Sequence, residues 1–145
     1  VQNIYESLVQ VDSVNKSYYE QNRDAYLQRL TELDQDISND LSGVTNRSFM
    51  VYHPAFVYFS EAYNLTIFSI EAAGKEPTAA GLVYLIEQAR EHNIKVILAS
   101  PQFNPQSSEV IAKAIDGTVA FVDPLARGYI RNMRLVLSEM VSAME

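Results

Sequence analysis

Phe49-Met50-Val51-Tyr52-His53-Pro54-Ala55-Phe56-Val57-Tyr58-Phe59 is the stretch of sequence that decides the expected fold. Its first residues form an apolar run typical of a buried strand, and the run reaches a histidine followed by proline. Pro54 has a fixed φ and no N–H group, so the strand should stop there and a helix can begin. His53 is thereby left at the carboxyl end of the strand. Because open parallel α/β sheets bind ligands outside this end of their strands, His53 is the first candidate functional residue.

Composition limits the classes of protein to which the chain can belong. With 145 residues, 48% of them hydrophobic, the chain is long enough for one ordinary domain with its own core. The formal net charge of -7 argues against a nucleic-acid partner, since phosphate backbones would be repelled. No cysteine is present, which excludes disulfides and thiolate metal sites. No apolar run approaches the ~18 residues of a membrane-spanning helix.

The first third of the chain is expected to be helical. Residues 1–11 have the apolar spacing of a helix but no capping signal ahead of them, which suggests the end of a preceding helix. Asp12 can cap a new start, and residues 12–43 are predicted to form a long helix with Gly43 at its end. One narrow stripe of this helix is apolar, at Tyr19, Tyr26, Leu30, Leu33, Ile37 and Leu41.

Residues 47–145 are predicted to form an α/β lobe with a four-stranded, mostly parallel sheet flanked by helices. Short apolar runs alternate with helix-length segments, and parallel neighbours need such crossover connections. Pro77 and Asn104-Pro105 are expected to open helices, and Gly117 is expected to end one. The methionines of the last helix are interpreted as core residues. The predicted strands are Phe49 to Tyr52, Thr66 to Ile70, Val96 to Ala99 and Val119 to Val122.

A polar residue follows each predicted strand. His53, Glu71, Ser100 and Asp123 should therefore meet at one edge if the sheet is parallel. His53 and Asp123 form the most informative pair, because imidazole and carboxylate are ligands that divalent metals take. On spacing alone the signal is weak, and an aspartate before proline is often only a turn former.

Other chemistries were weighed against the metal site. Ser100, His53 and Asp123 could be drawn as a hydrolase triad, but Ala99-Ser100-Pro101 lacks the glycines of a nucleophile elbow, and Pro101 removes an oxyanion-hole N–H. The single glycine in Ala73-Gly74-Lys75 does not make a phosphate-binding loop. His92 falls at a helix C-terminus and is interpreted as a surface residue.

Several motifs together resemble a known family. The stretch from Phe49 to Phe59 is followed by Tyr63-Asn64-Leu65, Glu76-Pro77, Pro101-Gln102-Phe103 and Asp123-Pro124-Leu125. In this order they are similar to the C-terminal lobe of the zinc/manganese-type solute-binding proteins of ABC importers. The segment Asp12-Ser13 and the long helix after it resemble the start of that family's interlobe backbone helix, which is usually written with Asp-Pro.

The resemblance implies a receptor and not an enzyme. In that family a metal lies between two lobes, and each lobe normally supplies two ligands. His53 and Asp123 match the C-terminal pair, so Zn²⁺, or else Mn²⁺, is the expected cargo. Ser100, Gln102 and Glu71 are candidates for hydrogen bonding to these ligands, although many relatives carry glutamate where this chain has Ser100.

The resemblance also implies partners and a location. The N-terminal lobe of the family has no counterpart in residues 1–145, which are read as a single domain, so this chain alone should bind zinc no more tightly than about micromolar. The expected partners are that lobe and the membrane permease of an ABC importer, outside the cytoplasm, with the membrane reached only through a lipid anchor beyond this segment. The alternative is a small α/β module that binds a protein or an anion and has no metal role.

Overall fold

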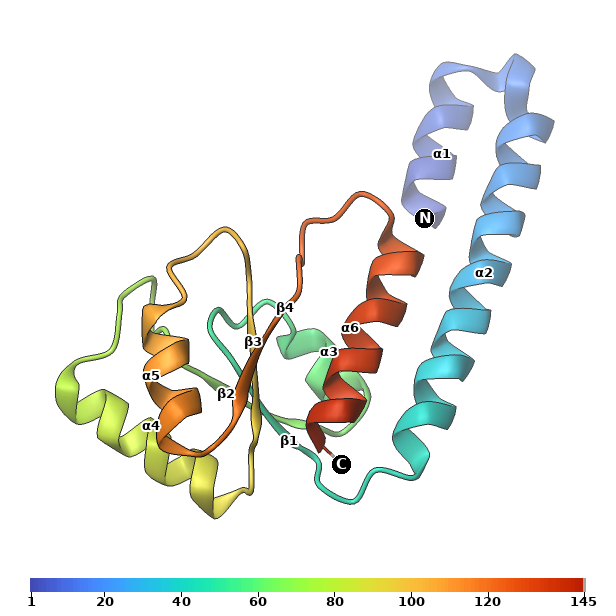
Figure 1. Ribbon diagram of the computed structural model, residues 1–145. Coiled ribbons are helices and arrows are strands. Elements are labelled where there is room, and N and C mark those ends of the chain that lie inside the picture. The colour runs from blue at the N-terminus through green and yellow to red at the C-terminus, as the bar shows by residue number, and fades with distance from the viewer. Residues whose placement is uncertain (145) are drawn as a thin grey trace. The chain divides into compact units, whose positions relative to one another are not determined.

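A computed structural model describes residues 1–144 of the chain, which divides into two compact units, Val1–Ser38 and Asn39–Glu145. The first unit contains α1 (Gln2–Val11), a 3₁₀ turn (Ser13–Asn15) and most of α2 (Lys16–Ser42) (Figure 1). Asp12 lies at the break between the two helices, and its side chain accepts hydrogen bonds from Asn15 Nδ2 at 2.8 Å and Tyr19 Oη at 2.7 Å. The predicted break is confirmed, although α2 itself begins only at Lys16, after the 3₁₀ turn.

The apolar stripe predicted for α2 corresponds to its most covered side. Leu33, Ile37 and Leu41 are buried, with exposed fractions of 2 to 3%. The helix ends at Ser42, directly before Gly43, as the sequence predicts. Among residues 1–144, no helix is both long enough and apolar enough to cross a membrane.

The second unit is built on a four-stranded sheet in the order β2-β1-β3-β4, and every neighbouring pair is parallel. This confirms the predicted α/β class. The strands fall within a residue or two of their predicted bounds: β1 is Ser48–Val51, β2 is Thr66–Ser69, β3 is Val96–Ala99 and β4 is Thr118–Phe121. The chain moves outward in opposite directions from β1 and β3, so the topological switch point lies between these two strands.

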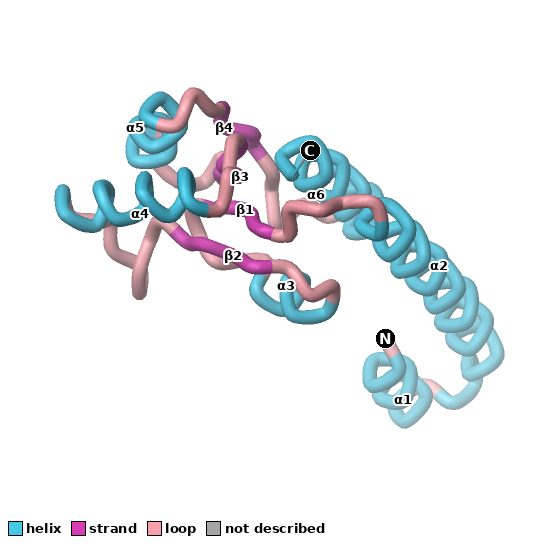
Figure 2. Tube along the Cα trace, turned by 90° about the horizontal axis from the view of Figure 1, so that it is seen from below, coloured by secondary structure: helices cyan, strands magenta, loops and turns pink. Residues whose placement is uncertain are grey.

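Helices cover both faces of the sheet, as Figure 2 shows. On one face lie α4 (Ala79–Glu91) and α5 (Gln106–Ala114), which pack on each other, with α5 against β3 and β4. On the other face, α3 (Val57–Ala62) packs against β2, and α6 (Tyr129–Met144) packs against β1 and β3. The central strand β1 is buried along its whole length. The methionines of α6 are core residues, as predicted: Met133, Met140 and Met144 are buried.

Two predicted helix starts were placed too early. Pro54 belongs to a turn in which the Ala55 N–H donates to the His53 carbonyl at 2.7 Å, and α3 begins only at Val57. Pro77 also precedes its helix, because Thr78 is the N-cap of α4 and its hydroxyl accepts from the Gly81 N–H at 3.1 Å. In both places the proline lies in the turn or loop before the helix, and a later residue is the N-cap.

The end of α5 follows the prediction at Gly117. The Gly117 N–H donates to the Ala112 carbonyl at 2.8 Å. Its neighbour Asp116 takes the left-handed conformation, with φ of 52°. Glycine is needed because a Cβ at position 117 would collide with the Lys95 carbonyl oxygen, which also accepts the Thr118 N–H at 2.8 Å.

Candidate metal centre

The register of the strands brings the predicted site residues to one edge. Val51 pairs with Ser69 on β2 and with Leu98 on β3. Two residues further along the same registers, His53 falls between Glu71 and Ser100. The ladder does continue past the strand ends, since the Glu71 N–H donates to the Tyr52 carbonyl at 3.0 Å. His53 therefore lies at the switch point of the sheet, where a ligand is expected.

His53 is held by Glu71. Its Nδ1 lies 2.9 Å from Glu71 Oε1, and the Glu71 side chain is only 9% exposed, whereas that of His53 is 42% exposed. A carboxylate can only accept, so Nδ1 carries a proton and donates it to this bond. The neutral imidazole then has its free lone pair on Nε2. This is the state in which a histidine binds a metal ion through Nε2.

Phe103 covers one face of the His53 imidazole. The two rings are stacked, with centroids 5.2 Å apart and an interplanar angle of 26°. Phe103 also contacts the ring of Tyr52 at 5.2 Å. The sequence contained Phe103 within a family motif, but nothing in the pattern indicated that its ring would lie against the histidine.

Asp123 follows β4 and is fixed through one of its two oxygens. Oδ1 accepts from Gln102 Nε2 at 2.7 Å and from the Leu125 N–H at 2.9 Å. Among the described residues, Oδ2 has no protein donor, so it remains available as a single metal ligand. Gln102 is oriented in turn by the Ser100 hydroxyl, which donates to Gln102 Oε1. Of the three residues predicted to support the ligands, Glu71 bonds to His53, whereas Ser100 and Gln102 form a chain of hydrogen bonds that ends at Asp123.

His53 and Pro124, the residue after Asp123, line one small recess. Its lining includes His53, Ser100 and Pro124, together with buried residues at the ends of β1, β3 and β4. The structure therefore brings both predicted ligands to the same edge of the sheet. In the part of the chain that the structure describes, no three His, Asp or Glu side chains gather closely enough to hold a metal ion. The edge offers one imidazole and one carboxylate, which is fewer than the three or four donors of a protein zinc site.

A second hydrogen-bond group stands beside this edge. Glu76 accepts from Tyr52 Oη at 2.6 Å through Oε1 and from the Ser107 hydroxyl at 2.6 Å through Oε2. The two hydroxyl donors hold the pKa of the Glu76 carboxyl below its usual value. The hydrogen bond from the Tyr52 hydroxyl to Glu76, together with burial, raises the pKa of Tyr52 to about 12. Glu76-Pro77 was recognised in the sequence as a family motif only, without a role for the carboxylate.

The structure also bears on two other interpretations, the hydrolase triad and the surface position of His92. The Ser100 hydroxyl bonds to Gln102 and the Nδ1 of His53 bonds to Glu71, so a hydrolase triad is not assembled at this edge. His92 caps the C-terminus of α4, where it was predicted. Its ring also packs on Phe68, with centroids 4.6 Å apart, so it is half-buried and not a simple surface residue.

The fold and the site define a class of protein: an α/β lobe that presents two candidate metal ligands at the carboxyl edge of its parallel sheet. Residues 1–143 match the family described as "Zinc-uptake complex component A periplasmic" (ZnuA). The chain belongs to this family.

Relatives of known sequence and structure agree with that assignment. The chain is 31% identical over 127 residues to the "High-affinity zinc uptake system protein ZnuA" of Bacillus subtilis, a match that covers 86% of this chain and 40% of the relative. It is 32% identical over 113 residues to the protein of the same name from Haemophilus influenzae, covering 76% of this chain and 33% of that one. The chain thus spans well under half the length of these relatives.

Solved structures carry the likeness over nearly the whole chain. A structure described as "Crystal structure of ZnuA" superposes with a TM-score of 0.96 at 35% identity, covering 99% of this chain and 55% of the other. A second, described as "138-173 ZnuA deletion mutant plus zinc bound", gives a TM-score of 0.93 at 35% identity with the same coverage.

Proposed function

We propose that this chain is the C-terminal part of a solute-binding protein that captures a divalent transition metal, Zn²⁺ in preference to Mn²⁺. The observation that supports the proposal is that His53 and Asp123 both follow parallel strands at the same edge of the sheet, each with its own hydrogen-bond partner. The names of the relatives support zinc as the cargo, since they are called zinc uptake proteins.

His53 and Asp123 are the proposed ligands. Glu71 keeps the proton on His53 Nδ1, so Nε2 is free to donate its lone pair to the metal. Gln102 and the Leu125 N–H saturate Asp123 Oδ1, which leaves Oδ2 as a single carboxylate donor. An imidazole nitrogen in the ligand set favours zinc over manganese, which prefers oxygen ligands.

The rest of the proposal concerns a longer protein. Two donors do not complete a zinc site, so the remaining ligands are proposed to come from the N-terminal lobe of such a protein. The complete receptor would work outside the cytoplasm and deliver its metal to the membrane permease of an ABC importer. The names of the matched relatives are those of uptake and metal-binding proteins, which supports a receptor and not an enzyme.

Zinc titration of the chain and two histidine variants tests the proposal. We expect calorimetry to give a dissociation constant no tighter than about 1 μM, because only two ligands are present. His53→Ala should weaken this binding at least about tenfold, since it removes the only nitrogen ligand. His92→Gln, away from the proposed site, should leave it unchanged.

The outcomes separate the competing functions. Equal zinc affinity in His53→Ala and the unchanged chain would contradict the metal role and favour a module that binds a protein or an anion. Stoichiometric nanomolar binding by the chain would instead show that the ligand set is wrong.

A further inference from the structure

Glu76 joins two loops that flank the candidate metal centre. The first is the loop between β2 and α4, in which residues Ala72 and Lys75 form an isolated antiparallel bridge. The second is the segment from the end of β3 to the first turn of α5, which carries Phe103 and Ser107. The Glu76 carboxylate accepts one hydroxyl from Ser107 and one from Tyr52, each at 2.6 Å. We call these three side chains the Glu76 bridge.

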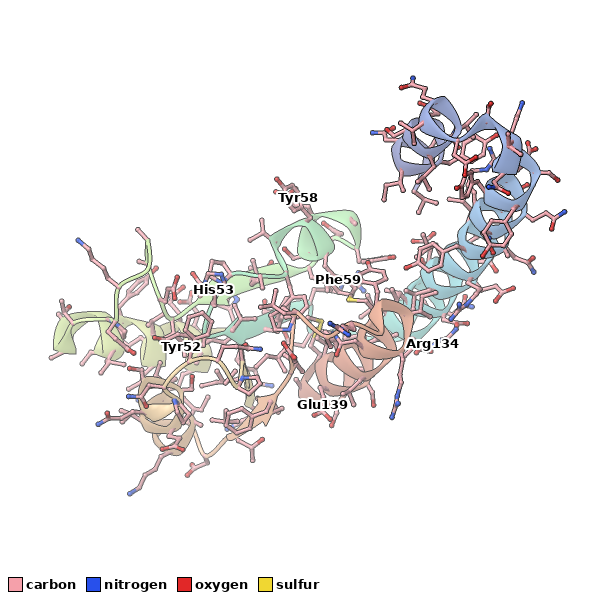
Figure 3. All side chains as sticks on the ribbon, turned by 90° about the horizontal axis from the view of Figure 1, so that it is seen from above. Tyr52, His53, Tyr58, Phe59, Arg134 and Glu139 are labelled. Carbon is pink, nitrogen blue, oxygen red and sulfur yellow. The ribbon has the colours of Figure 1, made fainter. Side chains whose placement is uncertain are left out.

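The Glu76 bridge reaches His53 through two ring contacts. Tyr52 is buried, with 5% of its surface exposed, and its ring lies against that of Phe103 with centroids 5.2 Å apart. Phe103 stacks at the same distance on His53. Tyr52 and His53 lie side by side at the end of β1, where Figure 3 labels them. Tyr52 and His53 therefore both contact the ring of Phe103, and among the described residues no hydrogen bond links the side chains of the bridge to the His53 side chain.

We propose that Glu76 is a positioning residue for the metal centre, which acts through Tyr52 and Phe103 to hold the imidazole of His53 in its binding orientation. The inference rests on the proposed function, because it gives the orientation of His53 a purpose. Glu76 is not proposed as a ligand, and each of its carboxylate oxygens accepts one hydroxyl hydrogen bond.

The physical argument is that His53 needs support on two sides. Glu71 fixes the edge of the imidazole at Nδ1, but a single hydrogen bond leaves the ring free to tilt about that bond. Phe103 supplies the second support against the ring face, yet its own side chain is 37% exposed and lies in a loop. A loop ring of this kind stays in place only if neighbouring groups fix it. Ser107 anchors the loop at the start of α5, and Tyr52 anchors the ring.

Nuclear magnetic resonance of the metal-free chain provides a direct test. The ring protons of His53 lie over an aromatic face, so their chemical shifts report the stack with Phe103. Glu76→Ala should move these shifts towards the values of a free imidazole. Glu87→Ala removes an exposed carboxylate from α4 and should leave them unchanged, which makes it the matched control.

A double-mutant cycle then separates positioning from general loosening. Tyr52→Phe keeps the ring and its contact with Phe103 but removes the hydroxyl arm of the bridge. If Glu76 acts through Tyr52, the shift change caused by Glu76→Ala should be much smaller in the Tyr52→Phe background. Tyr84→Phe, which removes a hydroxyl from an exposed tyrosine of α4, should leave the effect of Glu76→Ala at full size.

Zinc binding gives the second readout. Glu76→Ala should weaken zinc binding about twofold to threefold, well below the ~10-fold or greater loss that follows removal of a side chain bonded directly to a ligand. Unchanged His53 shifts in Glu76→Ala would overturn the positioning role, whatever the zinc result. If the His53 shifts change in Glu76→Ala but His53→Ala binds zinc as tightly as the unchanged chain, the contact between the bridge and His53 is supported and the metal role is overturned.

Discussion

Replacing Glu71 by glutamine changes the support of the proposed zinc ligand by a single charge. The side chain keeps its size and an oxygen acceptor, but the bond from His53 Nδ1 at 2.9 Å becomes neutral. A hydrogen bond to a charged group contributes ~1.5–3 kcal/mol, against ~0.5–1.5 for a neutral one. The His53 side chain is 42% exposed, and solvent screening brings the difference towards the lower end. We take ~1 kcal/mol, or about a fivefold weaker affinity for zinc.

Zinc titration of Glu71→Gln by calorimetry measures this loss, with Glu61→Gln as the control. Glu61 lies exposed on α3, eight residues along the chain from His53. Nitrogen chemical shifts of His53 add a readout independent of zinc, because they tell which ring nitrogen carries the proton. We expect the proton to lie less fully on Nδ1 in Glu71→Gln. Zinc affinity equal to that of Glu61→Gln, with the proton still on Nδ1, would refute the role assigned to Glu71.

Two further predictions concern Tyr52 and Gly117. The pKa of Tyr52 in the folded chain is raised from 10.0 to about 12, so its hydrogen-bonded hydroxyl should stabilise the fold fully below pH 10 and lose this effect as the pH rises towards 12. Phenolate absorbance checks the pKa, and the urea midpoint measured over the same pH range checks the loss of stability. Glu76→Ala should lower the pKa of Tyr52, because it removes the carboxylate that accepts the hydroxyl. Gly117→Ala should cost ~2–3 kcal/mol in urea unfolding, because the new Cβ meets the backbone of Lys95, whereas Gly43→Ala, with open space around it, should stay within ~0.5 kcal/mol.

Much of the fold could be predicted because apolar runs and crossover lengths leave few alternatives. A run such as Phe49 to Val51, buried on both faces, fits the centre of a parallel sheet and little else. The errors fell at helix starts. Helices were expected to begin directly after Pro54 and at Pro77, but they begin at Val57 and Ala79, because the sequence does not show how many turn residues follow each proline.

The shared edge of the candidate site residues was predictable, and the contacts between them were not. Polar residues at strand ends share an edge in any parallel sheet, so His53 and Asp123 could be paired from the sequence alone. The hydrogen-bond partner of each edge residue depends on the register of the strands, which the sequence pattern does not specify. The bond from His53 to Glu71 requires that Val51 pair with Ser69, and the stack on Phe103 depends on a loop conformation that no periodicity describes.

Register and turn geometry also position the two proposed ligands. The ladder that pairs β1 with β2 places Glu71 beside His53, and the turn after β4 directs the Leu125 N–H to Asp123. Both carboxylate–donor contacts are therefore set by the fold of the sheet edge. Weak zinc binding by this chain would then reflect the number of its donors and not their disorder, so adding a third nitrogen ligand at the edge should raise affinity without any change in folding.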